Sequence, residues 1–175
     1  MRTVRNYIPE NPKNSFLSCE KDTELILKKL FVDSRPYSDE LKRLLLINTK
    51  DCLDDRTNPV YKEKIENTSL ADLYDQGYIR LNPKITRGTH EEVKSYILIS
   101  LDNFSNNYLN PEYRDYTINF DIVCYNDTWI LDNYKIRPLL ICGYIEGILK
   151  SLTPKNMLDT KTFKPDIKLS GIGSY

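Results

Sequence analysis

The sequence predicts an α+β fold: a mainly antiparallel sheet with one long helix packed on it, preceded by a helical N-terminal region. Up to about Gly77, apolar residues recur at helical spacing, and from Val93 their period becomes two. After Pro138 a wide apolar stripe returns at helical spacing, which predicts the long helix. A chain with this order of elements usually packs its helix on one face of the sheet.

The N-terminal part divides into an arm and a helical region. Residues 1–20 are polar and contain Pro9 and Pro12, so we expect an extended N-terminal arm that orders only against a partner. The helical N-terminal region is expected over residues 21–77. Residues 51–67 within it are polar and are predicted to form a loop.

Three helical segments are expected in this region. The first should begin at Asp22 or Thr23 and end near Val32, and the second should follow Ser38. The third is a turn or two over residues 69–74, with Gly77 as the residue that ends it.

An α+β core domain is expected over residues 78–175. Its strands are predicted over residues 93–101 and 113–125, joined by a long polar connection over 102–112. Residues 128–131 are expected to pair as a hairpin, and a last short strand is expected around 167–169. Side chains predicted to be buried between sheet and helix are Ile97, Ile99, Ile118, Phe120, Ile122, Ile141, Ile145 and Ile148.

The bulk composition argues against several classes of function. The chain has 175 residues, with 25 basic and 25 acidic side chains, and nucleic-acid binders usually carry a basic excess. No apolar run reaches the roughly 20 residues of a membrane span, and the N-terminus lacks a signal-peptide pattern. The four cysteines share no metal-binding spacing and are expected to be reduced thiols in a protein made in a cytoplasm.

A search for catalytic patterns leads to no enzyme as the first expectation. The single histidine, His90, lies in a polar run and is expected to be solvated, and no phosphate-binding glycine loop occurs. No cofactor or metal is therefore expected. The alternative is a small metal-dependent nuclease that uses an acidic E-x-K site of Glu92, Lys94 and Asp121, with Asp102 and Asp115 as further carboxylates. The E-x-K pattern is short and arises by chance in a chain rich in both residues.

The aromatic residues favour contacts between protein chains. Tyrosines and Trp129 are concentrated between residues 108 and 134, where they are either sheet-face packing or interface anchors. Residues 101–150 have an acidic excess, whereas 1–50 and 151–175 have a basic excess. We therefore expect neighbouring copies to meet near Tyr113, Arg114, Asp115 and Trp129.

A resemblance to a known family agrees with this expectation. Residues 96–100 (YILIS), 102–104 (DNF), 110–115 (NPEYRD) and 118–122 (INFDI), followed by Asp127, Trp129 and Arg137-Pro138, resemble neck and tail-completion proteins of tailed bacteriophages. The resemblance covers about residues 93–150. Two departures are the longer helical front half, residues 20–75, and the end of the chain at residues 173–175.

The resemblance implies a structural virion protein, a tail-terminator-like or head–tail joining subunit. Such proteins form a ring, often a hexamer, that joins the tail tube to the head connector. The implied partners are further copies of the chain and the neighbouring connector and tail-tube proteins, with DNA able to pass through the ring. Tail terminator, tail-completion protein and head-completion adaptor remain open. A third option is a monomeric host-range or regulatory binding module.

Overall fold

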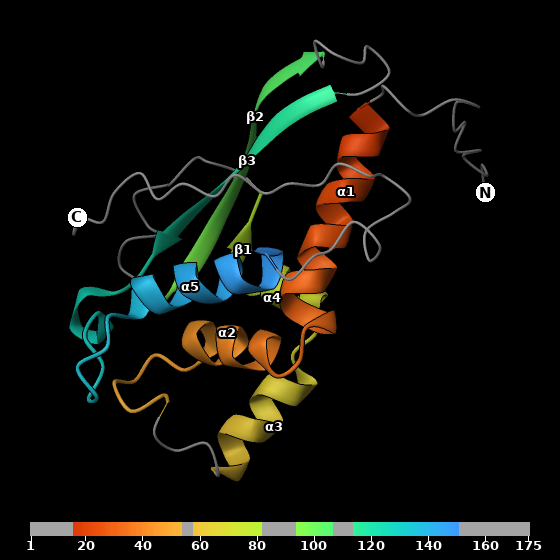
Figure 1. The fold of residues 1–175 in the computed structure, drawn as a ribbon. Coiled ribbons are helices and arrows are strands. Elements are labelled where there is room, and N and C mark those ends of the chain that lie inside the picture. The colour runs from red at the N-terminus through yellow and green to blue at the C-terminus, as the bar shows by residue number, and fades with distance from the viewer. Residues whose placement is uncertain (1–15, 54–57, 82–93, 107–113, 151–175) are drawn as a thin grey trace.

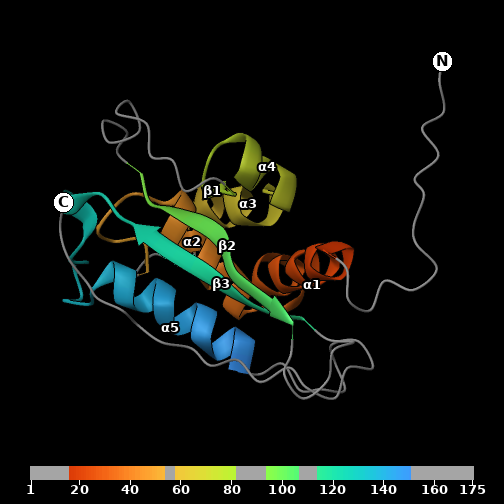
Figure 2. The same ribbon diagram turned by 90° about the horizontal axis from the view of Figure 1, so that it is seen from above.

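The computed structural model describes residues 16–53, 58–81, 94–106 and 114–150. The side chains of residues 16–18, 106 and 114 are not described. Most of the predicted arm and connection, and the predicted strand at 167–169, lie outside the described residues. Within them the fold is α+β, as predicted, with helices packed on a sheet (Figures 1 and 2).

Four α-helices are described in the N-terminal half. The first, α1, begins at Phe16 inside the predicted arm, and it continues into a π-helical turn, η2. The second begins one residue before Ser38, close to its prediction. The bounds are α1 Phe16–Lys28, η2 Lys29–Asp33, α2 Tyr37–Leu46, α3 Pro59–Asn67 and α4 Leu70–Asp75.

The loop predicted over residues 51–67 is wrong, because α3 occupies its second half. The side chain of Asn58 accepts a hydrogen bond from the backbone N–H of Val60, and Pro59 stands in the first turn, so the helix has a regular start. Its only buried residue is Ile65. A single buried position leaves no apolar period in the sequence, and the polar composition therefore suggested a loop.

The short helix α4 and its end agree with the sequence. Ser69 and Asp72 form a capping box, in which each side chain bonds the backbone N–H of the other residue. Gly77 then adopts φ +71°, a left-handed conformation that glycine enters without a Cβ penalty.

The sheet is mixed rather than purely antiparallel. Its order is β1-β2-β3, with β1 (Ile79–Arg80) parallel to β2 (Tyr96–Asn106) and β2 antiparallel to β3 (Arg114–Val123). The two-residue β1 is too short for a periodic signal. The strand β2 runs past its predicted end at Leu101, with an irregularity between Asp102 and Ser105 where Asn103 has φ 54°.

The predicted strand faces are confirmed by the register. Ile97 pairs with Ile122 and Ile99 with Phe120 on the face that packs against the helices. The isoleucines of β2 and α5 (Arg137–Lys150) in the predicted core are buried. Ile118, Phe120 and Ile122 are only half-buried, because β3 is the outer strand of the described sheet.

The helical region and the sheet share one hydrophobic core. Buried residues of α1, α2, α3 and α4 lie in the same cluster as those of β1, β2 and α5. In Figure 2, α2 lies beneath the sheet and α5 runs beside β3, and the β2–β3 hairpin extends beyond the helices in Figure 1. The two regions predicted over 21–77 and 78–175 are therefore packed together in the described residues.

Candidate functional site

A narrow tongue, defined as residues 129–137, connects the sheet to α5. The hairpin predicted over residues 128–131 is wrong, because Asn126–Thr128 form a short 3-10 helix, η4. Ile130 instead bridges Ile136 in antiparallel fashion, and the backbone N–H of Leu131 donates to the carbonyl of Lys135 at 2.9 Å. The polar residues 132–135 between Ile130-Leu131 and Ile136 are the sequence signal that could have indicated the tongue.

The tip of the tongue is an exposed tyrosine in an unfavourable backbone conformation. Tyr134 is 90% exposed and has φ 60°, in the left-handed region that non-glycine residues rarely enter. Its N–H donates to the carbonyl of Leu131 at 2.9 Å, which holds the turn. A strained backbone that presents a large aromatic side chain to solvent is typical of a binding site.

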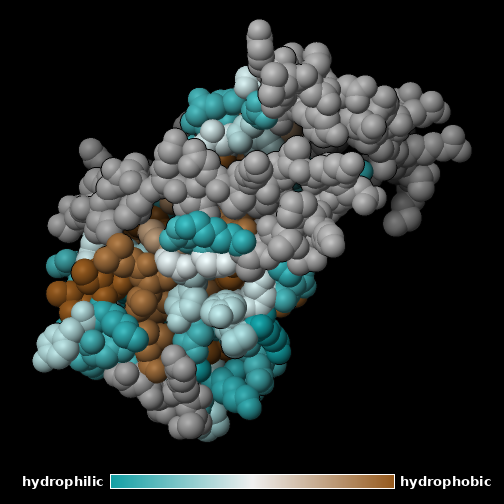
Figure 3. Space-filling model, viewed as in Figure 1, coloured by the Kyte–Doolittle hydropathy of each residue, from teal (hydrophilic) through white to brown (hydrophobic). Residues whose placement is uncertain are grey.

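The tongue and the start of α5 form an exposed apolar patch. Ile130 is 56% exposed, Ile136 37% and Leu139 41%. Figure 3 shows hydrophobic surface on the side of the molecule where the tongue and the first turn of α5 lie. Apolar patches with an aromatic centre are enriched where proteins contact one another.

A buried arginine holds the base of the tongue. Arg137 is 0% exposed, and its guanidinium donates hydrogen bonds to the carbonyls of Leu44 (2.6 Å), Ile47 (2.9 Å) and Thr128 (3.0 Å). It also reaches the carbonyl of Thr49 and lies 3.4 Å from the sulfur of Cys52. A guanidinium has five N–H donors, so it can satisfy several carbonyls that the end of α2 leaves without helical partners.

Two further ammonium groups bond backbone carbonyls at the C-terminal ends of α2 and α3. Lys64 of α3 donates to the carbonyl of Leu46 at 2.9 Å, and Lys42 of α2 donates to the carbonyl of Thr68 at 2.8 Å. Burial lowers the pKa of Lys42. The backbone N–H of Asp132 donates to the carbonyl of Lys50 at 3.1 Å, which ties the tongue to the segment after α2. The tongue is therefore a preorganised projection.

A shallow groove, wide open to solvent, lies between α3 and α4, away from the tongue. Its volume is about 550 Å³. Carboxylates and amides predominate, together with the exposed side chain of Val60. The lining residues are Val60, Glu63, Lys64, Asn67, Thr68, Asp72 and Gln76.

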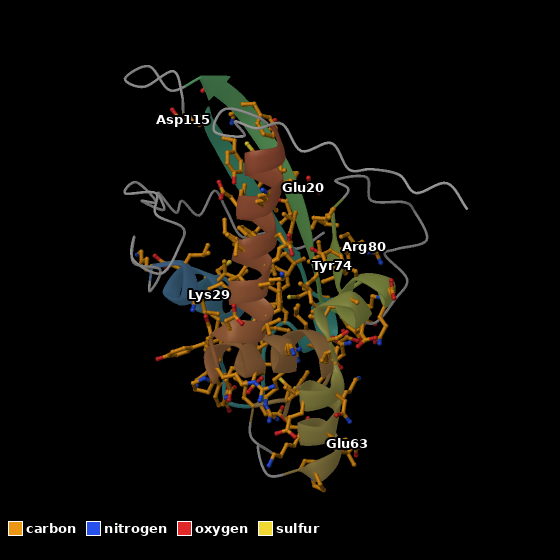
Figure 4. All side chains as sticks on the ribbon, turned by 90° about the vertical axis from the view of Figure 1, so that its right-hand side faces the viewer. Glu20, Lys29, Glu63, Tyr74, Arg80 and Asp115 are labelled. Atoms are coloured by element: carbon orange, nitrogen blue, oxygen red, sulfur yellow. The ribbon has the colours of Figure 1, made fainter. Side chains whose placement is uncertain are left out.

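Of the four residues predicted to form an interface between copies, Asp115 and Trp129 have described side chains, and these two lie apart. Tyr113 lies outside the described residues, and Arg114 begins β3. Asp115 is exposed near the far end of the β2–β3 hairpin (Figure 4), whereas Trp129 is half-buried at the base of the tongue. Asp115 and Val123 are eight positions apart on β3, or about 26 Å along an extended strand. If Asp115 and Trp129 both contact neighbouring chains, they belong to two separate contact surfaces.

Of the three residues of the nuclease alternative, Lys94 and Asp121 are described, and they also lie apart. Glu92 and His90 lie outside the described residues. The ammonium of Lys94 donates to the carbonyl of Gln76 at 2.7 Å and lies 5.1 Å from the centre of the Tyr78 ring. Asp121 of β3 pairs with Leu98 of β2. Leu98 follows Lys94 by four residues, which corresponds to about 13 Å along an extended strand. Across the described segments, no group of three or more histidine, cysteine, aspartate or glutamate side chains could hold a metal ion.

All four cysteines are at least partly removed from solvent. Cys19 and Cys52 are buried, and Cys124 and Cys142 are half-buried. Burial raises the pKa of Cys124 to about 11 and also raises the pKa of Cys142. Both side chains are therefore thiols at neutral pH and are poor nucleophiles.

Comparison with known protein families places the chain. A family model described as YomW matches residues 38–168, which include all but the first residue of α2, the sheet, the tongue and α5. The chain belongs to the YomW family. This is a phage-derived, SPBc2 prophage-like family, which agrees with the phage origin implied by the resemblance. No curated protein and no solved structure matches the chain.

The elements that present the tongue in this YomW-family protein were only partly visible in the sequence. The Arg137-Pro138 pair was part of the resemblance, but nothing marked Arg137 as buried. The α3–α4 groove was missed because α3 was predicted to be a loop. Among the described helices, none is both long and apolar enough to cross a membrane.

Proposed function

We propose that this phage-associated protein is a structural virion component, a subunit of the neck or tail ring that joins the tail tube to the head connector. In this proposal it works by binding other protein chains rather than by catalysis. It is made in the host cytoplasm and is incorporated into the virion. Tail-terminator, tail-completion and head-completion roles remain alternatives within it.

The observation that carries the proposal is the tongue. An exposed aromatic side chain lies on a backbone that is strained and yet held by the buried Arg137, so the protein maintains this projection at a cost in stability. The surrounding Ile130, Ile136 and Leu139 would be hidden from water in an assembly. The family match supports a phage context, and the neck and tail position comes from the resemblance over residues 93–150.

The mass of the purified protein is the first test. Native mass spectrometry and light scattering across a range of concentrations should give a closed oligomer, with six copies as the expected number. A control variant, Lys62→Ala on the exposed side of α3, should not change the mass.

The position in the phage particle is the second test. Antibodies against the tongue-bearing protein, or a fused tag, should label purified particles at the junction of head and tail. A protein that stays monomeric at all concentrations and is missing from purified particles would contradict the proposal and favour the monomeric binding module.

A further inference from the structure

We propose that the outer edge of β3 accepts a fourth strand, formed by residues 166–169 of the same chain. Within the described residues, β3 has a pairing partner on the side of β2 only. The inference goes beyond the proposed function and does not depend on the neck or tail position. A covered edge cannot pair with strands of other chains, so contacts between subunits fall to other surfaces such as the tongue.

The backbone of β3 presents hydrogen-bonding groups at this edge. The N–H of Ile97 donates to the carbonyl of Tyr78 at 2.9 Å, so the backbone groups of Ile97 point toward β1. Ile97 and Ile122 are therefore a non-hydrogen-bonded pair of the antiparallel ladder. Such pairs alternate with hydrogen-bonded ones, and the N–H and C=O groups of Phe120 and Ile122 therefore point away from β2. An extended segment beside β3 can bond these groups.

The connection through α5 has the direction and the hand that a fourth strand requires. In Figure 2, β3 runs toward the tongue, and α5 runs back beside it on the side away from β2. Figure 1 shows that α5 lies beneath β3. A strand that follows α5 and lies parallel to β3 at this edge completes a right-handed crossover. This is the hand of nearly all connections between parallel strands.

The segment that follows α5 contains the pattern of an edge strand. Apolar residues or proline alternate with charged residues, in the order Phe163, Lys164, Pro165, Asp166, Ile167, Lys168 and Leu169. Proline is confined to edge strands and strand starts, which fits a strand that begins just after Pro165. The YomW family match continues past α5 to residue 168, so it includes most of this segment.

The apolar side chains of the segment match the side of β3 that faces the helices. Phe120 and Ile122 pack against the core but are only half-buried. Ile167 beside Phe120 and Leu169 beside Ile122 would extend this apolar face over α5. Burial of apolar surface therefore favours the pairing. Ile118 lies before the added strand begins and stays half-buried.

Charge favours the same register. On the opposite face of β3 the carboxylate of Asp121 is exposed. The register given above places Lys168 beside it, and opposite charges on neighbouring strands attract. A shift by two residues in one direction would place Asp166 beside Asp121, where like charges repel. A shift in the other direction would place Lys168 beside the neutral Asn119 and lose the attraction at Asp121.

Residue-resolved hydrogen exchange of the full chain tests the pairing. The amides of Phe120 and Ile122 should exchange at least about tenfold more slowly than the amide of Ile118, which points out of the same edge before the added strand begins. In the proposed register the N–H of Lys168 faces β3. Lys168→Pro removes this donor, so the amides of Phe120 and Ile122 should then exchange as fast as that of Ile118.

Controls separate the loss of this strand from unfolding. Ile172→Pro, beyond the segment, should leave the exchange at both edge amides unchanged. The amide of Asn119 points toward β2 and should stay protected in every variant that keeps its sheet. If Lys168→Pro fails to fold, the charge pair gives a second test. Asp121→Lys should speed exchange at the edge amides several-fold, and the further change Lys168→Asp should restore their protection.

A mixing experiment identifies the chain that supplies the strand. Isotope-labelled Lys168→Pro protein is mixed with an excess of unlabelled, unmodified protein, and exchange is measured on the labelled chain. The amides of Phe120 and Ile122 should remain fast, because each chain uses its own segment. Restored protection would show that the strand comes from a neighbouring copy and would overturn the proposal. Fast exchange of both amides in the unmodified protein would overturn it as well, and neither result affects the ring proposal.

Discussion

The guanidinium of Arg137 donates a hydrogen bond to the carbonyl oxygen of Leu44 at 2.6 Å, which joins the first turn of α5 to the last turn of α2. A positive charge at the C-terminal end of a helix interacts favourably with the helix dipole. The same side chain bonds the carbonyl of Thr128 at the base of the tongue. One residue thus couples the helical layer to the projection that we propose as the assembly surface.

Removal of this side chain should destabilise the protein strongly. Arg137→Ala leaves several buried carbonyls without donors, so we expect the free energy of unfolding to fall by about 3–5 kcal/mol. Arg137→Lys keeps the charge but offers fewer donors and should lose about half as much. Lys135→Ala, on the exposed part of the tongue, should change the free energy of unfolding by less than about 0.5 kcal/mol. Urea denaturation gives all three values, and a loss below about 1 kcal/mol for Arg137→Ala would show that water replaces the guanidinium.

The two paired strands should differ in their sensitivity to truncation. Ile97→Ala in the central strand should cost about 2–5 kcal/mol, because the side chain is fully buried. Ile118→Ala in the outer strand should cost about half of that, because its side chain is only half-buried. Chemical denaturation of each variant measures both losses. Equal losses would indicate that the outer strand is covered in solution.

Asp22 should make stability depend on pH. Burial raises the pKa of its carboxyl above 3.8, so the folded protein disfavours the carboxylate more than the unfolded chain does. Its contribution is therefore unfavourable above the folded pKa, and stability is regained as the pH falls through that value. At pH 7 the free energy of unfolding of the Asp22→Asn variant should be higher than that of the unmodified protein. This difference between the two proteins should become smaller as the pH is lowered toward 4. Glu20→Gln, an exposed carboxylate in the same helix, is the control. An Asp22→Asn protein that is less stable at pH 7 would contradict the burial effect.

Relief of the strain at the tongue tip should separate stability from assembly. Glycine adopts φ 60° without a Cβ clash, so Tyr134→Gly should raise the monomer's free energy of unfolding by about 0.5 kcal/mol. The same variant should lose assembly, because the aromatic anchor is absent. Tyr37→Gly at the start of α2 should instead lower stability by up to about 1 kcal/mol and keep assembly. Thermal denaturation and light scattering on the same samples check both effects, and a Tyr134→Gly protein that still assembles would remove the tongue from the interface.

Periodic burial explains which elements could be predicted. The helices α2 and α5 each bury a full stripe, and β2 and β3 alternate along their length, so their residue patterns are strong. The helix α3 buries only Ile65 and was missed, and β1 has only two residues. The predicted pairing over residues 128–131 failed because the chain first makes the 3-10 helix η4 and then pairs within the tongue.

The α+β class, the faces of the two long strands and the long helix after Pro138 follow from the residue pattern alone, because local periodicity reports which side of an element avoids water. The burial of Arg137, the left-handed backbone of Tyr134 and the groove between α3 and α4 arise instead from tertiary contacts. The carbonyls that surround Arg137 come from segments up to 93 residues away, and no local pattern encodes such partners. Exposure and strain at a loop tip likewise depend on what the rest of the chain leaves uncovered, which is known only once the chain has folded.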